Sequence, residues 1–231
     1  MKILAIDTSG SVSSVAIVTE KFTLSEFAIN NKKSHSQTLM PMVEMALKYS
    51  STELKEIDYI ACSSGPGSFT GIRIGVSTAK ALAHGLSKRI VPVPTLDVLA
   101  YNVFDGTKLI VPIIDARRSQ VYSAFYRWEG SKLKRYSEYK NDYIDIILKQ
   151  AKEIDSSAIF VGDGIFSFES QILQNGFQIV PSNMNLQRAA SVGANSFNFI
   201  EKSVGYDEFI PFYLRETEAE REYERKKSCL S

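Results

Sequence analysis

Short apolar runs separated by polar turns predict an α/β fold for the first half of the chain. Residues 2–7, 12–19 and 22–29 have the β-rich composition of strands, and the turn at residues 8–11 indicates an antiparallel hairpin. Apolar residues at helical spacing follow, with Pro41 marking a kink or a first turn. The other elements expected here are a helix at 34–50, a buried strand at 58–62, a helix at 71–86, a strand at 90–93 and a short helix at 95–102.

A polar stretch at residues 104–108 predicts a boundary between two units. We place an N-terminal lobe at 1–105 and a smaller C-terminal lobe at 106–231, which repeats the strand, strand, helix, strand order of the first. The last packed helix, about residues 187–203, is a candidate for returning to the first lobe. The second unit is expected to hold strands at 109–115, 121–128, 133–139, 158–161 and 177–180 and helices at 142–154 and 187–201.

The nearly neutral net charge argues against a protein whose overall positive charge attracts nucleic acid. The 231 residues hold 27 Lys plus Arg against 26 Asp plus Glu, so any RNA contact needs a local patch or a partner. Cys62 and Cys229 lie far apart in the sequence, which favours a reducing cytosol over a disulfide scaffold. The chain opens on a strand-like run without a signal peptide, and no apolar run approaches the ~20 residues of a membrane span. We therefore expect a cytoplasmic protein without membrane contact.

A glycine-rich loop at residues 63–75 leads from a predicted strand into a predicted helix. Pro66 fixes its own φ, while Gly67 and Gly71 allow positive φ or the close approach of another backbone. Such a turn presents N–H groups at a helix N-terminus to an anion or to an acceptor from a partner. The loop lacks the Lys-Ser/Thr ending of a Walker A motif, so it fits a phosphate loop of that kind poorly.

The helix that follows this loop carries a stripe of small residues. Gly71, Gly75, Ala79 and Ala83 recur every four residues and therefore share one helix face. Two interpretations stand: the helix lies tightly on its own sheet, or a partner helix packs against the stripe.

Asp7, Thr8 and Ser9 at the tip of the first predicted hairpin are candidate nucleotide-binding residues. An acid followed by hydroxyls and a glycine suits a hairpin that holds a metal-bound water and faces phosphates. The alternative is that Asp7 and Ser9 only shape the turn by side-chain to backbone hydrogen bonds. His35 and His84 are the only histidines and lie far apart in the sequence, so it contains no His-x-x-x-His metal pair.

Asp115, Arg117 and Arg118 close a predicted strand at the junction of the lobes. A carboxylate beside two guanidinium groups suits either an anion site in the interlobe cleft or an ion-pair cluster that pins the halves together. Near the C-terminus, residues 215–227 alternate Glu with Arg and Lys, with Glu218 and Arg221 at helical pairing distance. That pattern is typical of a solvated helix, a frayed tail or a docking segment.

Five motifs together resemble the TsaB (YeaZ) family: ILAIDTS at residues 3–9, SHSQTL at 34–39, GPGSFTGIRIG at 65–75, DARR at 115–118 and YLR at 213–215. The resemblance runs nearly end to end. It implies a two-lobed actin-like, sugar-kinase and Hsp70-type (ASKHA) α/β fold, with mixed sheets flanked by helices and a reduced second lobe. It also implies a role in forming N6-threonylcarbamoyladenosine at position 37 of tRNAs that read codons starting with A.

The same resemblance implies a non-catalytic subunit beside TsaD, which carries the metal and transfers the threonylcarbamoyl group. Residues 95–99 stand where TsaD-like proteins carry a His-x-x-x-His pair, and they contain neither histidine. No tightly bound cofactor is expected, with ATP or ADP only in the complex. One alternative is a small actin-like ATP phosphotransferase or ATPase that uses Asp7. A peptidase would need a metal or a nucleophile–base pair that the sequence does not offer.

The resemblance further implies that the first two helices dock a TsaD-like protein or, in a homodimer, a second copy of this chain. A TsaE-like ATPase joins the larger complex, and tRNA is met only indirectly through it. Methionine and tyrosine side chains on the first helix suit an adaptable interface. The predicted interface residues are Thr38, Met42, Met45, Tyr49, Gly67, Phe69, Thr70, Gly71, Arg73, Ile74, Gly75 and Thr78.

Overall fold

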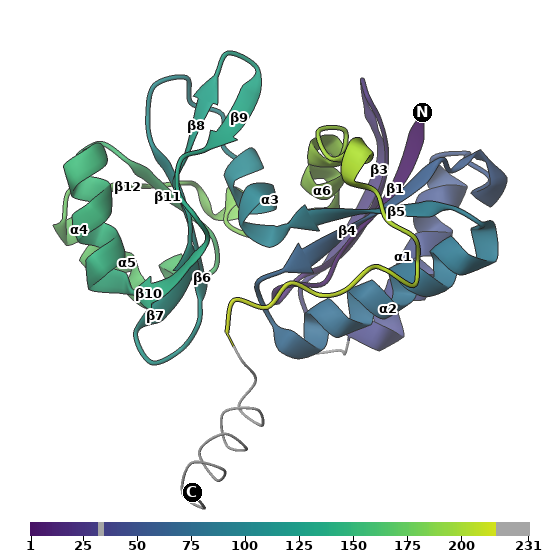
Figure 1. The fold of residues 1–231 in the computed structure, drawn as a ribbon, viewed down its shortest axis with the longest axis horizontal. Helices are drawn as coiled ribbons and strands as arrows, with labels where there is room; N and C mark the ends of the chain where they lie inside the picture. Colours follow the sequence, from purple (N-terminus) through teal and green to yellow (C-terminus); the bar gives the residue numbers. More distant parts are fainter. Residues whose placement is uncertain (32–34, 216–231) are drawn as a thin grey trace, which may run out of the picture.

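The computed structural model describes residues 1–31 and 35–215. Within them, two sheets form two lobes, each with helices on both faces (Figure 1). This arrangement confirms the predicted two-lobed α/β fold with mixed sheets. Ser34, Cys229 and the predicted charged segment beyond Arg215 lie outside the described residues. In the described part, no helix is both long enough and apolar enough to cross a membrane.

The first lobe is built on a five-stranded sheet of order β3-β2-β1-β4-β5. The hairpin strands β1, β2 and β3 pair antiparallel, whereas β4 and β5 run parallel to β1. The strand bounds are β1 (Lys2–Asp7), β2 (Ser13–Thr19), β3 (Thr23–Ile29), β4 (Tyr59–Gly65) and β5 (Arg89–Pro94).

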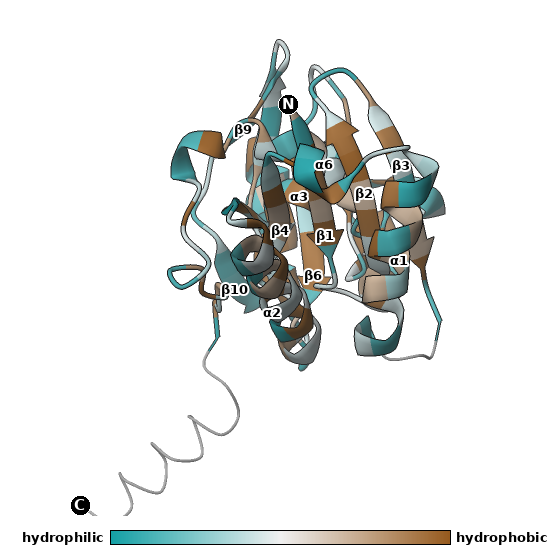
Figure 2. Cartoon of the chain, turned by 90° about the vertical axis from the view of Figure 1, so that its right-hand side faces the viewer, coloured by the Kyte–Doolittle hydropathy of each residue, from teal (hydrophilic) through white to brown (hydrophobic). Residues whose placement is uncertain are grey.

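Alternate side chains of β1 point to opposite faces of this sheet. Leu4 and Ile6 pack beneath α1 (His35–Tyr49) and α2 (Phe69–Leu86), whereas Ile3 and Ala5 pack on the side of α6 (Ala189–Ser196). Because helices cover both faces, the central strands are hydrophobic on both sides, as the brown colour of β1 and β2 shows (Figure 2).

The second lobe is a sheet of order β10-β7-β6-β11-β12, and β8 pairs with both β6 and β9. Two helices, α4 (Ile144–Ile154) and α5 (Ile165–Gln174), cover one face, and α3 (Thr95–Tyr101) covers the other. The strands are β6 (Ile110–Asp115), β7 (Gln120–Ser123), β8 (Tyr126–Glu129), β9 (Lys132–Arg135), β10 (Lys140–Tyr143), β11 (Ile159–Val161) and β12 (Gln178–Ile179).

Two strand predictions in this lobe were wrong in extent. The single strand expected at 121–128 is divided into β7 and β8, which pair with β6 in one register but have different outer neighbours, β10 beside β7 and β9 beside β8. The strand expected at 133–139 ends at Arg135, and β10 takes residues that were expected to begin a helix. The helix α5 was not predicted, although its buried residues Ile165 and Ile172 have helical spacing.

The chain returns to the first lobe through α6. A Cβ at Gly193 would lie 2.5 Å from Cγ2 of Val18, so only glycine permits this close approach to β2. The helix ends at Ser196, earlier than expected, and a short 3-10 helix, η3 (Ile200–Lys202), follows. The remaining segment runs past β5 and along α2 (Figure 1), and Arg215 then donates to the Ala116 carbonyl of the second lobe at 2.9 Å.

Candidate functional site

The glycine loop holds the first hairpin against the start of α2. Ser68 caps α2, since its Oγ accepts from the Gly71 N–H at 3.2 Å. The Ser68 N–H in turn donates to the Ser9 carbonyl at 2.7 Å. The Thr8 hydroxyl donates to the Gly71 carbonyl at 2.7 Å. The loop and the hairpin tip are therefore one hydrogen-bonded unit.

The glycines of this unit allow a close approach within the chain. A Cβ at Gly71 would lie 2.0 Å from the Thr8 carbonyl oxygen, and one at Gly75 would lie 2.4 Å from Thr8 Oγ1. Ala79 and Ala83 continue the stripe into the core, where both are fully buried. Of the two interpretations of the small-residue stripe, packing of the helix on its own lobe is the one that this geometry fits.

The candidate nucleotide-binding residues are buried beneath the hairpin tip. Asp7 is fully buried, and its Oδ1 accepts from the Ser9 N–H at 2.8 Å and from the Ser9 hydroxyl at 2.7 Å. Its Oδ2 has no hydrogen-bond partner among the described residues. Burial raises the pKa of the Asp7 carboxyl to about 6, and the two bonds from Ser9 partly oppose that shift. Nucleotide contact by Asp7, Thr8 and Ser9 stays a prediction.

A cleft of about 510 Å³ lies between the lobes and is the second part of the site. Ser9 from the hairpin faces it from one side, and Asp115 and Arg117 face it from the other. Asp115 accepts from the Arg117 N–H at 2.7 Å and from the Ser167 hydroxyl at 2.7 Å. Arg118 is not among the residues that line the cleft.

Sequence reasoning missed Asp163 as a member of this cleft. The residue follows β11 in the Gly162-Asp163-Gly164 turn, and burial raises the pKa of its carboxyl to about 6. A Cβ at Gly162 or Gly164 would lie 2.2 or 3.1 Å from the Ile113 carbonyl oxygen. The sequence pattern that could have identified it is an acidic residue between two glycines directly after a strand. In the structure, this residue lines the same cleft as the first hairpin.

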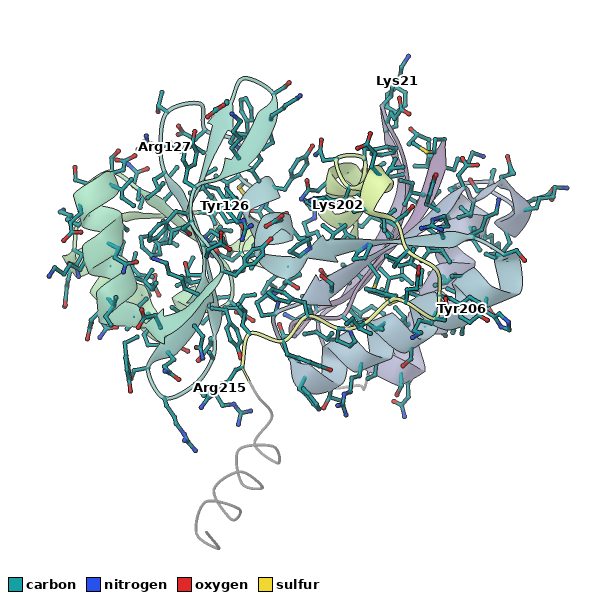
Figure 3. All side chains as sticks on the ribbon, in the orientation of Figure 1. Lys21, Tyr126, Arg127, Lys202, Tyr206 and Arg215 are labelled. Carbon is teal, nitrogen blue, oxygen red and sulfur yellow. The ribbon has the colours of Figure 1, made fainter. Side chains whose placement is uncertain are left out.

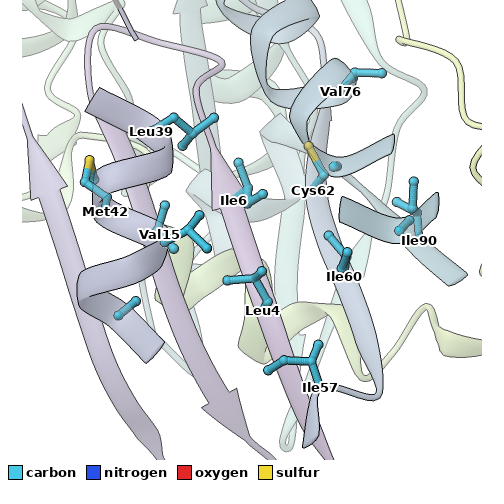
Figure 4. Packing of buried hydrophobic residues seen from close by; sticks show 14 of the residues in the cluster. Leu4, Ile6, Val15, Leu39, Met42, Ile57, Ile60, Cys62, Val76 and Ile90 are labelled. Carbon is cyan, nitrogen blue, oxygen red and sulfur yellow. The ribbon is translucent and has the colours of Figure 1, made fainter. Parts of the chain in front are cut away.

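The predicted partner surface divides into buried and exposed residues. Met42 is 1% exposed and points from α1 into the core (Figure 4), and Gly71 and Gly75 are covered by the hairpin. Met45 and Tyr49 are exposed on α1. A groove of about 510 Å³ runs between the two helices and is lined by Ser36, Phe69, Thr70, Arg73, Ile74, Ser77 and Thr78.

The exposed end of this groove is held in place by aromatic contacts. The Arg73 guanidinium lies 3.8 Å from the centre of the Phe69 ring, and its Nε donates to the Tyr213 hydroxyl at 3.2 Å. Phe69 and Tyr213 pack with ring centres 4.9 Å apart. Within the described ranges, no three His, Cys, Asp or Glu side chains lie close enough together to hold a metal ion.

Two mixed-sheet lobes with a hairpin tip facing the cleft between them make this a two-lobed α/β protein, the architecture that the motifs implied through the actin-like, sugar-kinase and Hsp70-type (ASKHA) fold. The family model described as "TsaD: tRNA N6-adenosine threonylcarbamoyltransferase" matches residues 23–223. The TsaB protein of Bacillus subtilis, a tRNA threonylcarbamoyladenosine biosynthesis protein, is 34% identical over 96% of this chain and 98% of its own length. The chain therefore belongs to the TsaB family, as its motifs predicted.

A further relative agrees with this assignment, and a solved structure agrees with the fold. TsaB of Escherichia coli is 29% identical over 93% of this chain and 95% of its own length. The solved structure of YeaZ from Pseudomonas aeruginosa matches with a TM-score of 0.74, covers 92% of this chain and 99% of that chain, and is 23% identical. The structural likeness confirms the two-lobed fold over nearly the whole of both molecules.

Proposed function

We propose that this chain is an accessory, non-catalytic subunit in the synthesis of N6-threonylcarbamoyladenosine at position 37 of tRNA. Its TsaB-named relatives and the match to the TsaD family model support this role. In the proposal, a TsaD-like partner transfers the threonylcarbamoyl group, a TsaE-like ATPase visits the assembly in the cytoplasm, and tRNA is met through the complex.

The groove between α1 and α2 carries the proposal. Its walls combine the apolar surface of Phe69 and Ile74 with small hydroxyl residues, a shape and composition that suits a packed helix from a partner. Met45 and Tyr49 are also exposed, with 42% and 67% of their areas open to solvent, but they lie on the other side of α1 from Ser36, where Tyr49 packs against Phe27 of β3. The proposed docking surface is thus the lining of the groove, with Met45 and Tyr49 as a separate exposed patch on α1, and without Met42, Gly71 and Gly75, which pack inside the lobe.

Helix α3 supports a non-catalytic role. Residues 95–99, which resemble the segment that holds the paired histidines in TsaD-like proteins, are buried between the sheets. Their acidic member, Asp97, accepts hydrogen bonds from two tyrosines. The proposal therefore places the chemistry in the partner.

A pull-down with a TsaD-like protein tests the docking surface. Ser77→Arg puts a long charged side chain into the groove from an exposed position, so we expect it to abolish capture, and Ile74→Asp to do the same. Ser156→Arg makes the matched change at an exposed turn of the second lobe and is expected to leave capture unchanged. Capture by both groove variants at the level of the unaltered chain would refute the assignment.

Two measurements complete the test of function. Light scattering of the isolated chain tests whether it forms a homodimer, and loss of such a dimer in Ser77→Arg would show that a second copy uses the same surface as the partner. Reconstitution of the tRNA modification with and without this chain tests the role itself. Equal modification in its absence would reject the accessory function.

A further inference from the structure

A cavity of about 710 Å³ lies between the β8–β9 hairpin of the second lobe and the α6–η3 region that packs on the first. It shares no lining residue with the interlobe cleft or with the α1–α2 groove. Figure 3 shows Tyr126 on the second-lobe side of this region and Lys202 on the first-lobe side. Known ligand pockets in proteins have volumes of about 300–1,000 Å³, so this cavity has room for a small organic ligand.

Positive charge is concentrated around the cavity. Lys132 and Arg135 come from β9 and Lys202 from η3, in a chain whose net charge is only +1. Lys132 and Lys202 form no ion pair with any other residue in the described part of the chain, so both ammonium groups are available to a ligand. A cluster of this kind favours an anion, and Arg and Lys together are the usual partners of phosphate.

Aromatic rings lie beside these cations. The Arg135 guanidinium lies 3.8 Å from the centre of the Tyr139 ring, and the Lys202 ammonium lies 5.5 Å from the centre of the Phe199 ring. Aromatic rings and guanidinium planes are the surfaces on which nucleic acid bases stack, at a gain of about 1–3 kcal/mol per base. The combination indicates a ligand with both a phosphate and a planar ring.

Polar groups line the inner wall of the cavity. Asp97 lies there with two phenols on its Oδ1, and Asn195, only 4% exposed, lines the same cavity. A carboxylate and side-chain amides offer acceptors and donors to the edge of a base or to a sugar hydroxyl.

We propose that this cavity binds one nucleotide, free or within an RNA chain. Its phosphate lies among Lys132, Arg135 and Lys202, and its base lies against Tyr139 and Phe199. This local basic and aromatic cluster is absent from the linear sequence, because its members come from segments far apart in the chain. The site is independent of partner docking through α1 and α2, so loss of one leaves the other intact.

Fluorescence anisotropy with the full chain tests the proposal. The probes are N-methylanthraniloyl-AMP and a fluorescein-labelled unmodified tRNA. We expect saturable binding of at least one probe, weakened at least about tenfold by Arg135→Glu with Lys202→Glu, since each removes a charge-assisted contact. Lys21→Glu with Lys149→Glu, both at exposed positions away from the cavity, makes the same charge change elsewhere and is expected to bind as the unaltered chain does.

The two probes distinguish the source of the nucleotide. Binding of the AMP derivative identifies a free nucleotide, and binding of the tRNA alone identifies a nucleotide within RNA. Lys132→Ala at an exposed side chain probes the same site if the double variant melts early. Two results would overturn the proposal: no saturable binding of either probe, or binding that Arg117→Glu in the interlobe cleft weakens and the cavity variants do not.

Discussion

The phenol of Tyr126 on β8 donates a 2.5 Å hydrogen bond to Oδ1 of Asp97 on α3, which fastens the second lobe to the helix packed against it. Tyr139 donates to the same oxygen at 2.8 Å. Burial raises the pKa of the Asp97 carboxyl and of both phenols, so at neutral pH the phenols remain protonated donors. One carboxylate thus holds β8 and the connection between β9 and β10 against α3.

Tyr126→Phe removes one of these donors and keeps the ring. We expect the free energy of unfolding to fall by about 1.5–3 kcal/mol, the usual contribution of a hydrogen bond to a charged group. Urea unfolding measures the change. Tyr136→Phe is the matched control, because its phenol contacts Glu129 on the surface and its loss is expected to cost less than about 0.5 kcal/mol. Equal losses in the two variants would contradict the importance of the buried bond.

Asp7→Asn is expected to stabilise the protein at neutral pH. The raised pKa, about 6 against 3.8 for the ordinary group, means that the folded state holds a proton more tightly than the unfolded state. The contribution of Asp7 to stability is therefore fully present below pH 4 and is lost as the pH rises through 6. At pH 7.5 the variant gains up to about 3 kcal/mol, and the gain shrinks toward pH 4.

The surface carboxylate Asp105 supplies the opposite case for that measurement. Its pKa is lowered by hydrogen bonds from the N–H groups of Lys108 and Thr107. Asp105→Asn is expected to destabilise the protein at pH 7.5 and to have less effect as the pH falls below 4. A gain for Asp7→Asn that does not change between pH 4 and 7.5 would rule out the buried charge as its cause.

Gly71→Ala and Gly85→Ala make the same change on one helix with opposite expected results. The new Cβ at position 71 would lie 2.0 Å from the Thr8 carbonyl oxygen, whereas nothing lies within 4 Å of the one at position 85. We expect a loss of more than about 2 kcal/mol at Gly71 from overpacking and a gain of about 0.5–1 kcal/mol at Gly85 from helix propensity. Thermal unfolding compares the two, and a stabilised Gly71→Ala would disprove the tight contact with the hairpin.

Phe209→Ala tests the segment that follows η3. Phe209 is 1% exposed and packs in the core of the first lobe, so its truncation is expected to cost about 3–5 kcal/mol. The neighbouring Ile210 is 74% exposed, and Ile210→Ala is expected to change stability by less than about 0.5 kcal/mol. The midpoints of urea unfolding compare the two variants. A loss of stability below about 1 kcal/mol for Phe209→Ala would mean that this segment is only loosely attached to the first lobe.

The parts of the fold that the sequence predicted are those with a local pattern. The strands β1 and β4 are short apolar runs, and α2 begins at a capping Ser68 after a glycine loop. Where the outer neighbour changes from β10 to β9, between Ser123 and Tyr126, hydrophobicity continues across the break and gives no sign of it. The exposed and buried members of α1 differ only by which face meets the sheet, so Met42 and Met45 look alike in the sequence.

The site was predictable to the same degree. Asp7, Asp115 and Arg117 stand in short motifs at strand ends, so the sequence names them as candidates, and the structure brings Asp115 and Arg117 to the cleft. Asp97 and Lys202 lie in unremarkable helical segments, and only the folding of α3, the β8–β9 hairpin and η3 toward one another brings them to a single cavity. No window of sequence contains that relationship.

Phe69 and Thr70 line both the α1–α2 groove and the interlobe cleft. A molecule in the cleft and a helix in the groove would therefore touch the same two residues from opposite sides. Their affinities are thermodynamically linked. If the molecule in the cleft changes the affinity for the helix by some factor, the helix changes the affinity for that molecule by the same factor. The first turn of α2 is thus the point through which a helix bound in the groove and a molecule bound between the lobes would change each other's affinity.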